Sequence, residues 1–260
     1  MKKISKLLND IINLFQILAF RDFLKYIFYI IKNIPEIIKS GNMGSVDIQY
    51  GNTVKIPTKK NTLIVQGQSI LGQIREIWAR KVYAQGNFFD HIADGCTVVD
   101  MGANVGTFTL YALSNLNVAR LISIEPNAEL NEQFKQNIRL NFPNANVTLL
   151  SAFVGDFSEK QERMVLDSVY NNAEMMTIDK LINNYSIKQI DFLKCDIEGG
   201  EYSILNKDSK LLQITKKLAV EIHDFAGKRN ELIDLIKSSG FKVRHYIDNP
   251  NDCIILAEKA

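Results

Sequence analysis

The sequence has little cysteine and almost no excess of charge of either sign. Its cysteines, Cys96, Cys195 and Cys253, are far apart and lie in apolar, strand-like runs, so neither a disulfide framework nor a cysteine-based zinc site is expected. This cysteine usage favours a reducing, cytoplasmic location. The formal charge of +2 is far from the basic excess typical of nucleic-acid-binding proteins, so we expect no nucleic-acid partner.

The sequence also lacks an uninterrupted apolar run that could span a membrane. Residues 11–38 are rich in Ile, Leu, Phe and Tyr, but Arg21, Lys25 and Lys32 interrupt them, whereas a spanning helix needs about 20 mostly apolar residues. No small-residue cleavage pattern follows, which argues against a signal peptide.

Residues 1–40 are predicted to form apolar helices with a narrow polar stripe, because the polar side chains recur at helical spacing. The apolar sides of such helices must be buried somewhere. Two interpretations stay open: packing on the rest of the chain or on a second subunit, or docking on the inner surface of a membrane through Lys25, Lys32 and the aromatic residues.

A length of 260 residues with 46% apolar content predicts one large α/β core with a smaller attachment. We expect apolar helices at 1–40, a small β element at 41–73 and the main domain at 74–260. Within the β element, 46–50, 53–56 and 63–65 have the composition of short strands. A helix is expected at 74–83, with Glu76, Arg80 and Tyr83 near the entrance to the main domain.

The main domain alternates buried strand-like runs with helical patterns. The expected strands are 97–100, 121–125, 147–153, 190–196 and 218–223, with helices at 128–140 and 228–239 among the connections. This alternation predicts right-handed crossovers and a mostly parallel sheet. The last two runs, 241–247 and 253–257, are joined by a turn too short for a crossover, so they should be antiparallel.

Asp100, Gly102, Asn104 and Gly106 form a turn between a buried strand and a helix, the layout of a nucleotide-type cofactor loop. The two glycines permit a left-handed backbone, and the helix N-terminus offers unpaired N–H groups. A dinucleotide-binding loop has glycine at position 104, so Asn104 favours a ligand without phosphates. S-adenosylmethionine (SAM) fits this loop.

Several segments together resemble the FkbM-type methyltransferases, a family of SAM-dependent enzymes. They are 98–106 (VVDMGANVG), 124–127 (IEPN), 137–141 (NIRLN), 152–156 (AFVGD), 177–181 (TIDKL), 191–201 (DFLKCDIEGGE) and 220–223 (VEIH). The resemblance covers roughly residues 75–225. It implies a Rossmann-like methyltransferase sheet, mostly parallel with a closing antiparallel hairpin, preceded by the helical and small β extension. It also implies O-methylation of a hydroxyl on a sugar, glycan or glycolipid acceptor.

The cofactor is expected to lie along the ends of the first three main-domain strands. Glu125 lies roughly 20 residues beyond the glycine loop, the offset at which an acid accepts both ribose hydroxyls. Asn127 should lie over the same pocket. Ala152 and Phe153 are placed to flank the adenine ring, although a core position for Phe153 fits the sequence almost as well.

Acidic side chains and a histidine follow the fourth and fifth strands. Asp196, Glu198 and Glu201 cluster at the carboxyl edge, where α/β enzymes bind ligands, and His223 reaches the same edge. The catalytic base is His223 or Asp196, with Glu198 as orienter. A divalent ion held by Asp196, Glu198 and His223 is an alternative use of these residues.

Two rival functions are considered, and sequence features count against the first of them. An NAD-type oxidoreductase would continue with parallel crossovers and would have glycine at position 104. A non-catalytic, membrane-attached scaffold with a methyltransferase fold would bind no SAM.

Overall fold

The computed structural model describes residues 2–59, 61–155, 166–223, 228–248 and 252–260, with side chains from Leu7 onward. The chain divides into two compact units. Unit 1 is Met1–Lys81 with Gln133–Pro143, and unit 2 is Val82–Glu132 with Asn144–Ala260. The three-part division expected from the sequence stays a prediction.

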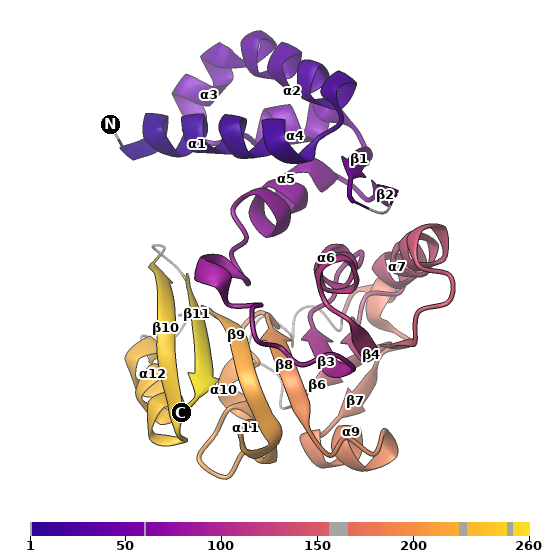
Figure 1. Ribbon diagram of the computed structural model, residues 1–260, viewed down its shortest axis with the longest axis vertical. Coiled ribbons are helices and arrows are strands. Elements are labelled where there is room, and N and C mark those ends of the chain that lie inside the picture. The colour runs from indigo at the N-terminus through magenta and orange to yellow at the C-terminus, as the bar shows by residue number, and fades with distance from the viewer. Residues whose placement is uncertain (1, 60, 156–165, 224–227, 249–251) are drawn as a thin grey trace. The chain divides into compact units, whose positions relative to one another are not determined.

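Unit 1 begins with helices and ends with a hairpin and a short helical segment (Figure 1). The helices are α1 (Lys2–Ile17), α2 (Phe20–Lys32), α3 (Ile34–Ser40) and α4 (Gly44–Tyr50). Strands β1 (Thr53–Pro57) and β2 (Thr62–Gln66) pair antiparallel, and they precede α5 (Ile70–Ile74) and the π-helical turn η1 (Arg75–Ala79). None of the described helices is long and apolar enough to cross a membrane.

Two expectations about unit 1 are wrong. Residues 46–50 form helix α4 rather than a strand, because Val46 and Tyr50 bury one helical face. On the same helix, Asp47 makes a bidentate pair with the buried Arg75, at 2.7 and 2.6 Å. The helix expected at 74–83 instead begins at Ile70, with α5, and ends at Ala79, with the π-helical turn η1. Tyr83 therefore lies outside it.

Two asparagines of α7 (Ala128–Asn141) bind the open edge of β2. The Asn137 side chain accepts from the Gln66 N–H at 2.9 Å and donates to the Gln66 carbonyl at 2.8 Å. Asn141 does the same with Ile64, at 2.8 and 2.9 Å. Each asparagine side-chain amide offers one acceptor and one donor, as a peptide group does. The two side chains therefore make the hydrogen bonds that a neighbouring strand would make along this edge.

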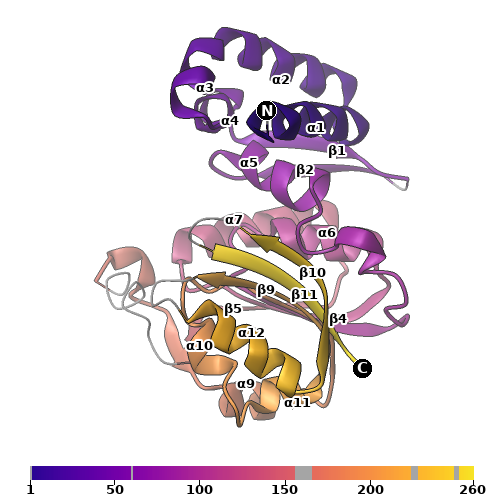
Figure 2. The ribbon, with the colours of Figure 1, turned by 90° about the vertical axis from the view of Figure 1, so that its left-hand side faces the viewer.

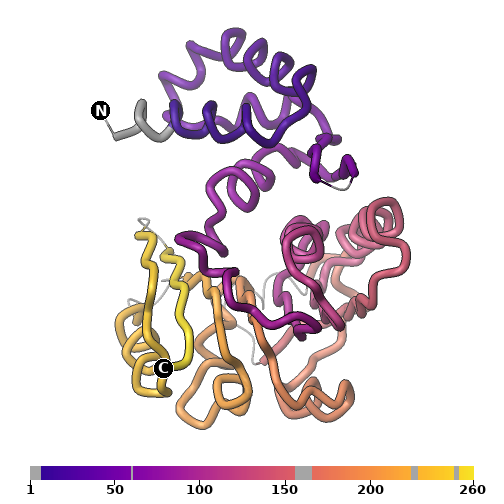
Figure 3. The backbone as a smooth tube through the Cα atoms, viewed as in Figure 1, coloured from indigo at the N-terminus to yellow at the C-terminus, as the bar shows by residue number. Residues whose placement is uncertain are grey.

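Unit 2 is built on a seven-stranded sheet of order β10-β11-β9-β8-β3-β4-β5 (Figure 1). Its strands are β3 (Cys96–Met101), β4 (Val118–Ile124), β5 (Val147–Leu150), β8 (Ile190–Cys195), β9 (Thr215–His223), β10 (Phe241–Asp248) and β11 (Asp252–Lys259). Five strands from β5 to β9 run parallel, and β11 is antiparallel to both β9 and β10. The trace in Figure 3 shows the C-terminal strand between β10 and β9.

This topology confirms the predicted mostly parallel sheet with its closing antiparallel pair. The turn that joins β10 to β11 contains residues 249–251, which lie outside the described residues. One detail differs: the run 147–153 is not a single strand. It breaks at Ser151, and β6 (Ala152–Val154) leaves the main sheet to pair with β7 (Glu174–Met176).

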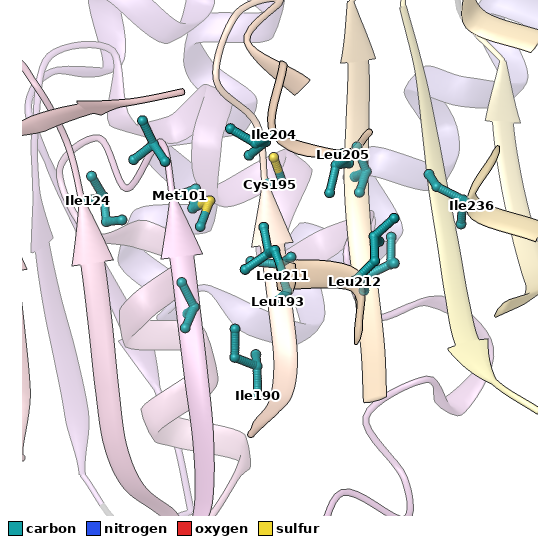
Figure 4. Packing of buried hydrophobic residues seen from close by; sticks show 14 of the residues in the cluster. Met101, Ile124, Ile190, Leu193, Cys195, Ile204, Leu205, Leu211, Leu212 and Ile236 are labelled. Carbon is teal, nitrogen blue, oxygen red and sulfur yellow. The ribbon is translucent and has the colours of Figure 1, made fainter. Parts of the chain in front are cut away.

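Helices cover both faces of the sheet. The connections are η2 (Gln85–Asn87), α6 (Thr107–Asn115), η3 (Ser168–Tyr170), α9 (Ile178–Asn184), α10 (Glu201–Ile204), α11 (Lys210–Ile214) and α12 (Arg229–Ser238). Leu193 on one face of β8 belongs to a core with Ile204, Leu211 and Leu212 (Figure 4), and α12 packs on the same side near β10 (Figure 2). On the other face, Phe192 stacks on Phe108 of α6 with ring centroids 5.8 Å apart.

The asparagine contacts on β2 predict a stability effect. We expect Asn137→Ala to lower the free energy of unfolding by about 1–3 kcal/mol, because it removes both hydrogen bonds to the partly buried N–H and carbonyl of Gln66. Urea denaturation would measure the loss. Gln136→Ala, an exposed change on the same helix, is the control and should shift stability by less than about 0.5 kcal/mol. Equal effects of the two changes would contradict the proposed role of Asn137.

Candidate active site

The loop after β3 has the left-handed backbone conformation that was expected at its two glycines. Gly102 and Gly106 have φ of 77° and 86°, and Asn104 is itself left-handed at 50°. A Cβ at Gly102 would lie 1.8 Å from the Asp196 carbonyl oxygen, so only glycine allows the β3 and β8 ends to approach this closely. Gly106 immediately precedes α6, so the N–H groups of the first turn of this helix lie next to the loop.

Glu125 ties the loop to the end of β4. One carboxylate oxygen accepts from the Asn104 N–H and the other from the Asn127 N–H, both at 2.9 Å. Burial raises the pKa of Glu125 to about 6, although the two N–H bonds favour its charged form. Each oxygen of a carboxylate can accept more than one hydrogen bond, so the predicted ribose role is compatible with these contacts.

The other predicted cofactor residues have local structural partners. The Asn127 side-chain oxygen accepts from the N–H groups of Glu129 and Leu130, so this residue caps α7. Ala152 and Phe153 are buried in β6, and the Phe153 ring packs against Tyr170 with centroids 5.6 Å apart. The assignment of these three residues to the cofactor stays a prediction.

A buried lysine lies beneath the loop. Lys194 is 3% exposed, and its ammonium donates to the carbonyls of Gly102 at 2.6 Å and Met101 at 3.2 Å. It also lies 3.4 Å from Asp100 and 3.5 Å from Asp196. Burial alone would lower the pKa of Lys194, but the charges of Asp196 and Asp100 outweigh it and raise that pKa. The lysine is therefore the positive charge that lets the acids converge.

Asp100 faces the interior of unit 2. It is fully buried, and one oxygen accepts from Thr109 at 2.8 Å while the other has only the Lys194 ammonium beside it. Burial raises the pKa of Asp100, against the opposing charge of Lys194. Through Lys194, which also binds the Gly102 carbonyl, Asp100 helps to hold the loop.

His223 lies among three carboxylates at the ends of β8 and β9. Its Nδ1 is 3.2 Å from Glu201, and its Nε2 is 3.3 Å from Glu198 and 3.9 Å from Asp196. Glu201 is fully buried and also accepts from the N–H groups of Ile197 and Gly199. Glu201 therefore holds the imidazole at Nδ1, and the orienting role expected of Glu198, which lies beside Nε2, stays a prediction.

The protonation of His223 follows from these neighbours. Burial alone would lower its pKa, but the hydrogen bond to Glu201 and the charges of Glu201, Asp196 and Glu198 outweigh burial and raise the pKa to about 9. At neutral pH the imidazole of the ligand-free protein is therefore protonated, with Nδ1–H donating to Glu201.

Tyr83 and Glu221 complete the cluster. The Tyr83 hydroxyl donates to Glu221 at 2.8 Å and lies 3.3 Å from Asp196. Among the described residues, the ligand atoms of Asp196, Glu221 and His223 lie within 4.8 Å of one another. This set differs from the one expected for a divalent ion by having Glu221 in place of Glu198, and the expected set stays a prediction. Two carboxylates and an imidazole fit such an ion, and Glu201 would fix the histidine tautomer.

Three residues of the cluster were not among the site residues predicted from the sequence: Lys194, Tyr83 and Glu221. The alternation of β9 places Glu221 on the same face as His223, which is a signal available in the sequence. Lys194 alternates in the same way with Asp196 at the end of β8. Nothing local in the sequence marks Tyr83, because it comes from a segment without regular structure.

The family profile described as "Methyltransferase FkbM domain" matches residues 100–243. This range is more than half of the chain and contains both the loop and the histidine cluster. The chain belongs to the FkbM methyltransferase family. Membership decides against the NAD-dependent alternative, in agreement with the antiparallel pair that closes the sheet.

Two curated proteins are similar to part of this chain. The chain is 24% identical over 220 residues to Methyltransferase sdnD from Sordaria araneosa, which covers 65% of this chain and 85% of that protein. It is 23% identical over 223 residues to the AMB antimetabolite synthetase AmbE of Pseudomonas aeruginosa. That alignment covers 65% of this chain but spans only 10% of AmbE.

Solved structures with low sequence identity were also found. An rRNA methylase from Streptococcus thermophilus is 12% identical with a TM-score of 0.46, and the match covers 70% of this chain and 95% of that one. Precorrin-6y C5,15-methyltransferase from Geobacter metallireducens is 13% identical with a TM-score of 0.45, covering 65% and 83%.

The contact between Glu201 and His223 can be tested by titration. We expect Glu201→Gln to move the pKa of His223 from about 9 toward its ordinary value. The reason is that the charge of Glu201 and its hydrogen bond, which together raise this pKa most, are lost or weakened. NMR titration of the imidazole signals measures this shift, and Glu198→Gln, at a side chain 41% exposed, should move the pKa less. An unchanged pKa in Glu201→Gln would refute the pairing.

The same raised pKa predicts how stability changes with pH. A histidine whose folded pKa exceeds its unfolded value of 6.5 stabilises the fold fully below that pH, and the contribution is lost as pH rises through about 9. In urea denaturation, the free energy of unfolding of the wild type should therefore fall relative to that of His223→Asn as the pH rises from 6.5 to about 9. A difference between the two proteins that does not change with pH would contradict this account.

Proposed function

We propose that the protein transfers the methyl group of SAM to a hydroxyl group of a sugar, glycan or glycolipid acceptor. The observation that carries the proposal is the His223 cluster at the ends of β8 and β9, next to the Gly102 turn after β3. In a parallel sheet this edge is where ligands bind. The family membership supports methyl transfer as the reaction.

The charge of the cluster suits a cationic cofactor. Among the described residues, the carboxylates of Asp196, Glu198 and Glu201 surround the protonated His223, and the Lys194 ammonium lies 3.5 Å from Asp196. The excess of acid would attract the sulfonium of SAM, and the Glu125 carboxylate would accept its ribose hydroxyls. Asn104 stands where a pyrophosphate-binding turn has glycine, and its side chain fits a ligand without phosphates.

Methyl transfer is an in-line displacement in which the S–CH₃ bond breaks as the bond to the acceptor oxygen forms. The hydroxyl proton must pass to a base. His223 already carries a proton at neutral pH, which leaves the 28% exposed Asp196 carboxylate as the proposed base. The role of His223 is then to position Asp196 and the acceptor. Alignment of the two reactants can itself be worth roughly 7–11 kcal/mol of the barrier.

The assignment of Asp196 can be tested by replacing the carboxylate with its amide. We expect Asp196→Asn to lower kcat by about 10²–10⁴-fold, because a general base is lost while the site keeps its shape. Asp208→Asn, at an exposed position of unit 2, is the control and should leave kcat unchanged. If Asp196→Asn kept the full rate while His223→Asn lost it, the histidine would be the base.

The cofactor site predicts a pH dependence of SAM binding. Glu125 is ionised only above its raised pKa of about 6, so affinity for SAM should fall as pH falls through this value. Glu125→Gln should weaken binding roughly tenfold and remove the pH dependence, since one charged acceptor is worth about 1.4 kcal/mol. Isothermal titration calorimetry measures both. Wild-type affinity in Glu125→Gln would exclude the ribose role.

A labelled-methyl transfer screen over hydroxylated glycans and lipids tests the reaction itself. Transfer to a hydroxyl acceptor supports the proposal, and no SAM binding at all would favour the scaffold alternative. Repeating the assay with a chelator tests the divalent ion that Asp196, Glu221 and His223 would hold. An ion bound there would supply Lewis-acid activation of the hydroxyl. An unchanged rate would show that the residues act without it.

A further inference from the structure

Unit 1 exposes an unusual number of large apolar side chains. Among the described residues fourteen such side chains are exposed, and ten of them lie between Leu8 and Ile48. Single exposed apolar residues are normal on a protein surface, but a concentration of this kind marks an interaction surface.

On α2 the exposed apolar side chains lie on one face. They follow helical spacing and are 51–67% exposed: Phe20, Leu24, Phe28 and Ile31. The residues of the same helix that are buried in unit 1 are Tyr26 and Ile30. Helix α2 therefore has two apolar faces, of which the protein buries one.

Helix α1 continues the exposed face. Leu8, Ile12 and Phe15 recur at helical spacing and are 54–58% exposed. The Phe15 ring meets the half-buried Phe23 of α2 edge-on, with centroids 5.0 Å apart, so Phe15 lies against α2. Figure 3 shows α1 and α2 side by side. We call Leu8, Ile12, Phe15, Phe20, Leu24, Phe28 and Ile31 the apolar surface.

Basic side chains run along the border of the apolar surface. Arg21, Lys25 and Lys32 are exposed, and their spacing places them on α2 beside the Phe28 side of its apolar face. The one acid of this helix, Asp22, accepts a hydrogen bond from Tyr50 at 2.9 Å. Residues 1–40 hold seven Lys or Arg and three Asp or Glu, a formal charge of +4, which leaves −2 for the rest of the chain.

We propose that the apolar surface docks on an anionic lipid bilayer, with α1 and α2 lying in the interface. An apolar helix face bordered by basic residues is the arrangement that binds such membranes. A second copy of this chain is the rival occupant, but two surfaces that each belong to a +4 segment would repel one another. This proposal is independent of methyl transfer, so it can fail or succeed separately.

The test is co-sedimentation of the full chain with vesicles of phosphatidylcholine alone and of equal parts phosphatidylcholine and phosphatidylglycerol. We expect the wild type to bind the anionic vesicles and to bind the neutral ones much more weakly. Leu24→Asp with Phe28→Asp should lower partitioning at least tenfold, since each buried side chain alone is worth roughly that much. Arg21→Gln with Lys32→Gln should lower it by about fivefold per residue.

Leu166→Asp is the matched control, because Leu166 is an 86% exposed apolar residue of unit 2. It should sediment like the wild type, and circular dichroism would show that all variants fold. Equal binding to both vesicle types, or unchanged binding of Leu24→Asp with Phe28→Asp, would overturn the proposal. A third result would also overturn it: the wild type does not bind vesicles and is a dimer in analytical ultracentrifugation, whereas the double variant is a monomer.

Discussion

The arrangement of the site depends on one buried positive charge. The Lys194 ammonium binds the Gly102 carbonyl and lies within 3.5 Å of both Asp100 and Asp196, although it is almost inaccessible to water. Two acids at the adjacent ends of β3 and β8 would otherwise repel one another in a poorly solvated place. Lys194 offsets that repulsion and at the same time fixes the backbone of the cofactor loop.

A second interaction extends the same principle to β9. Glu201 is anchored by two backbone N–H groups and holds the His223 ring, which in turn faces Glu198 and Asp196. The site thus places several acids around two cations, Lys194 and His223, and we propose that these acids attract a cationic ligand. This is the electrostatic basis on which we propose SAM binding.

The sheet and the placement of the acids could be predicted from the sequence, since buried strands, the Gly102 turn and the short link before β11 are local signals. Features set by distant contacts could not. Residues 46–50 fold as α4 because Asp47 meets Arg75, and β6 leaves the main sheet because β7 offers it a partner. Tyr83 contacts Glu221 from a segment that was expected to be helical but lies beyond the end of the helix. The site residues remain predictions until a ligand is bound.

A crystal structure with bound SAM would test the central claim most directly. We predict that the ribose hydroxyls bind Glu125 and that the sulfonium lies against the carboxylate cluster, with the methyl group directed toward the space beside Asp196 and His223. A cofactor whose ribose points away from Glu125, or whose sulfonium lies far from these acids, would contradict the account.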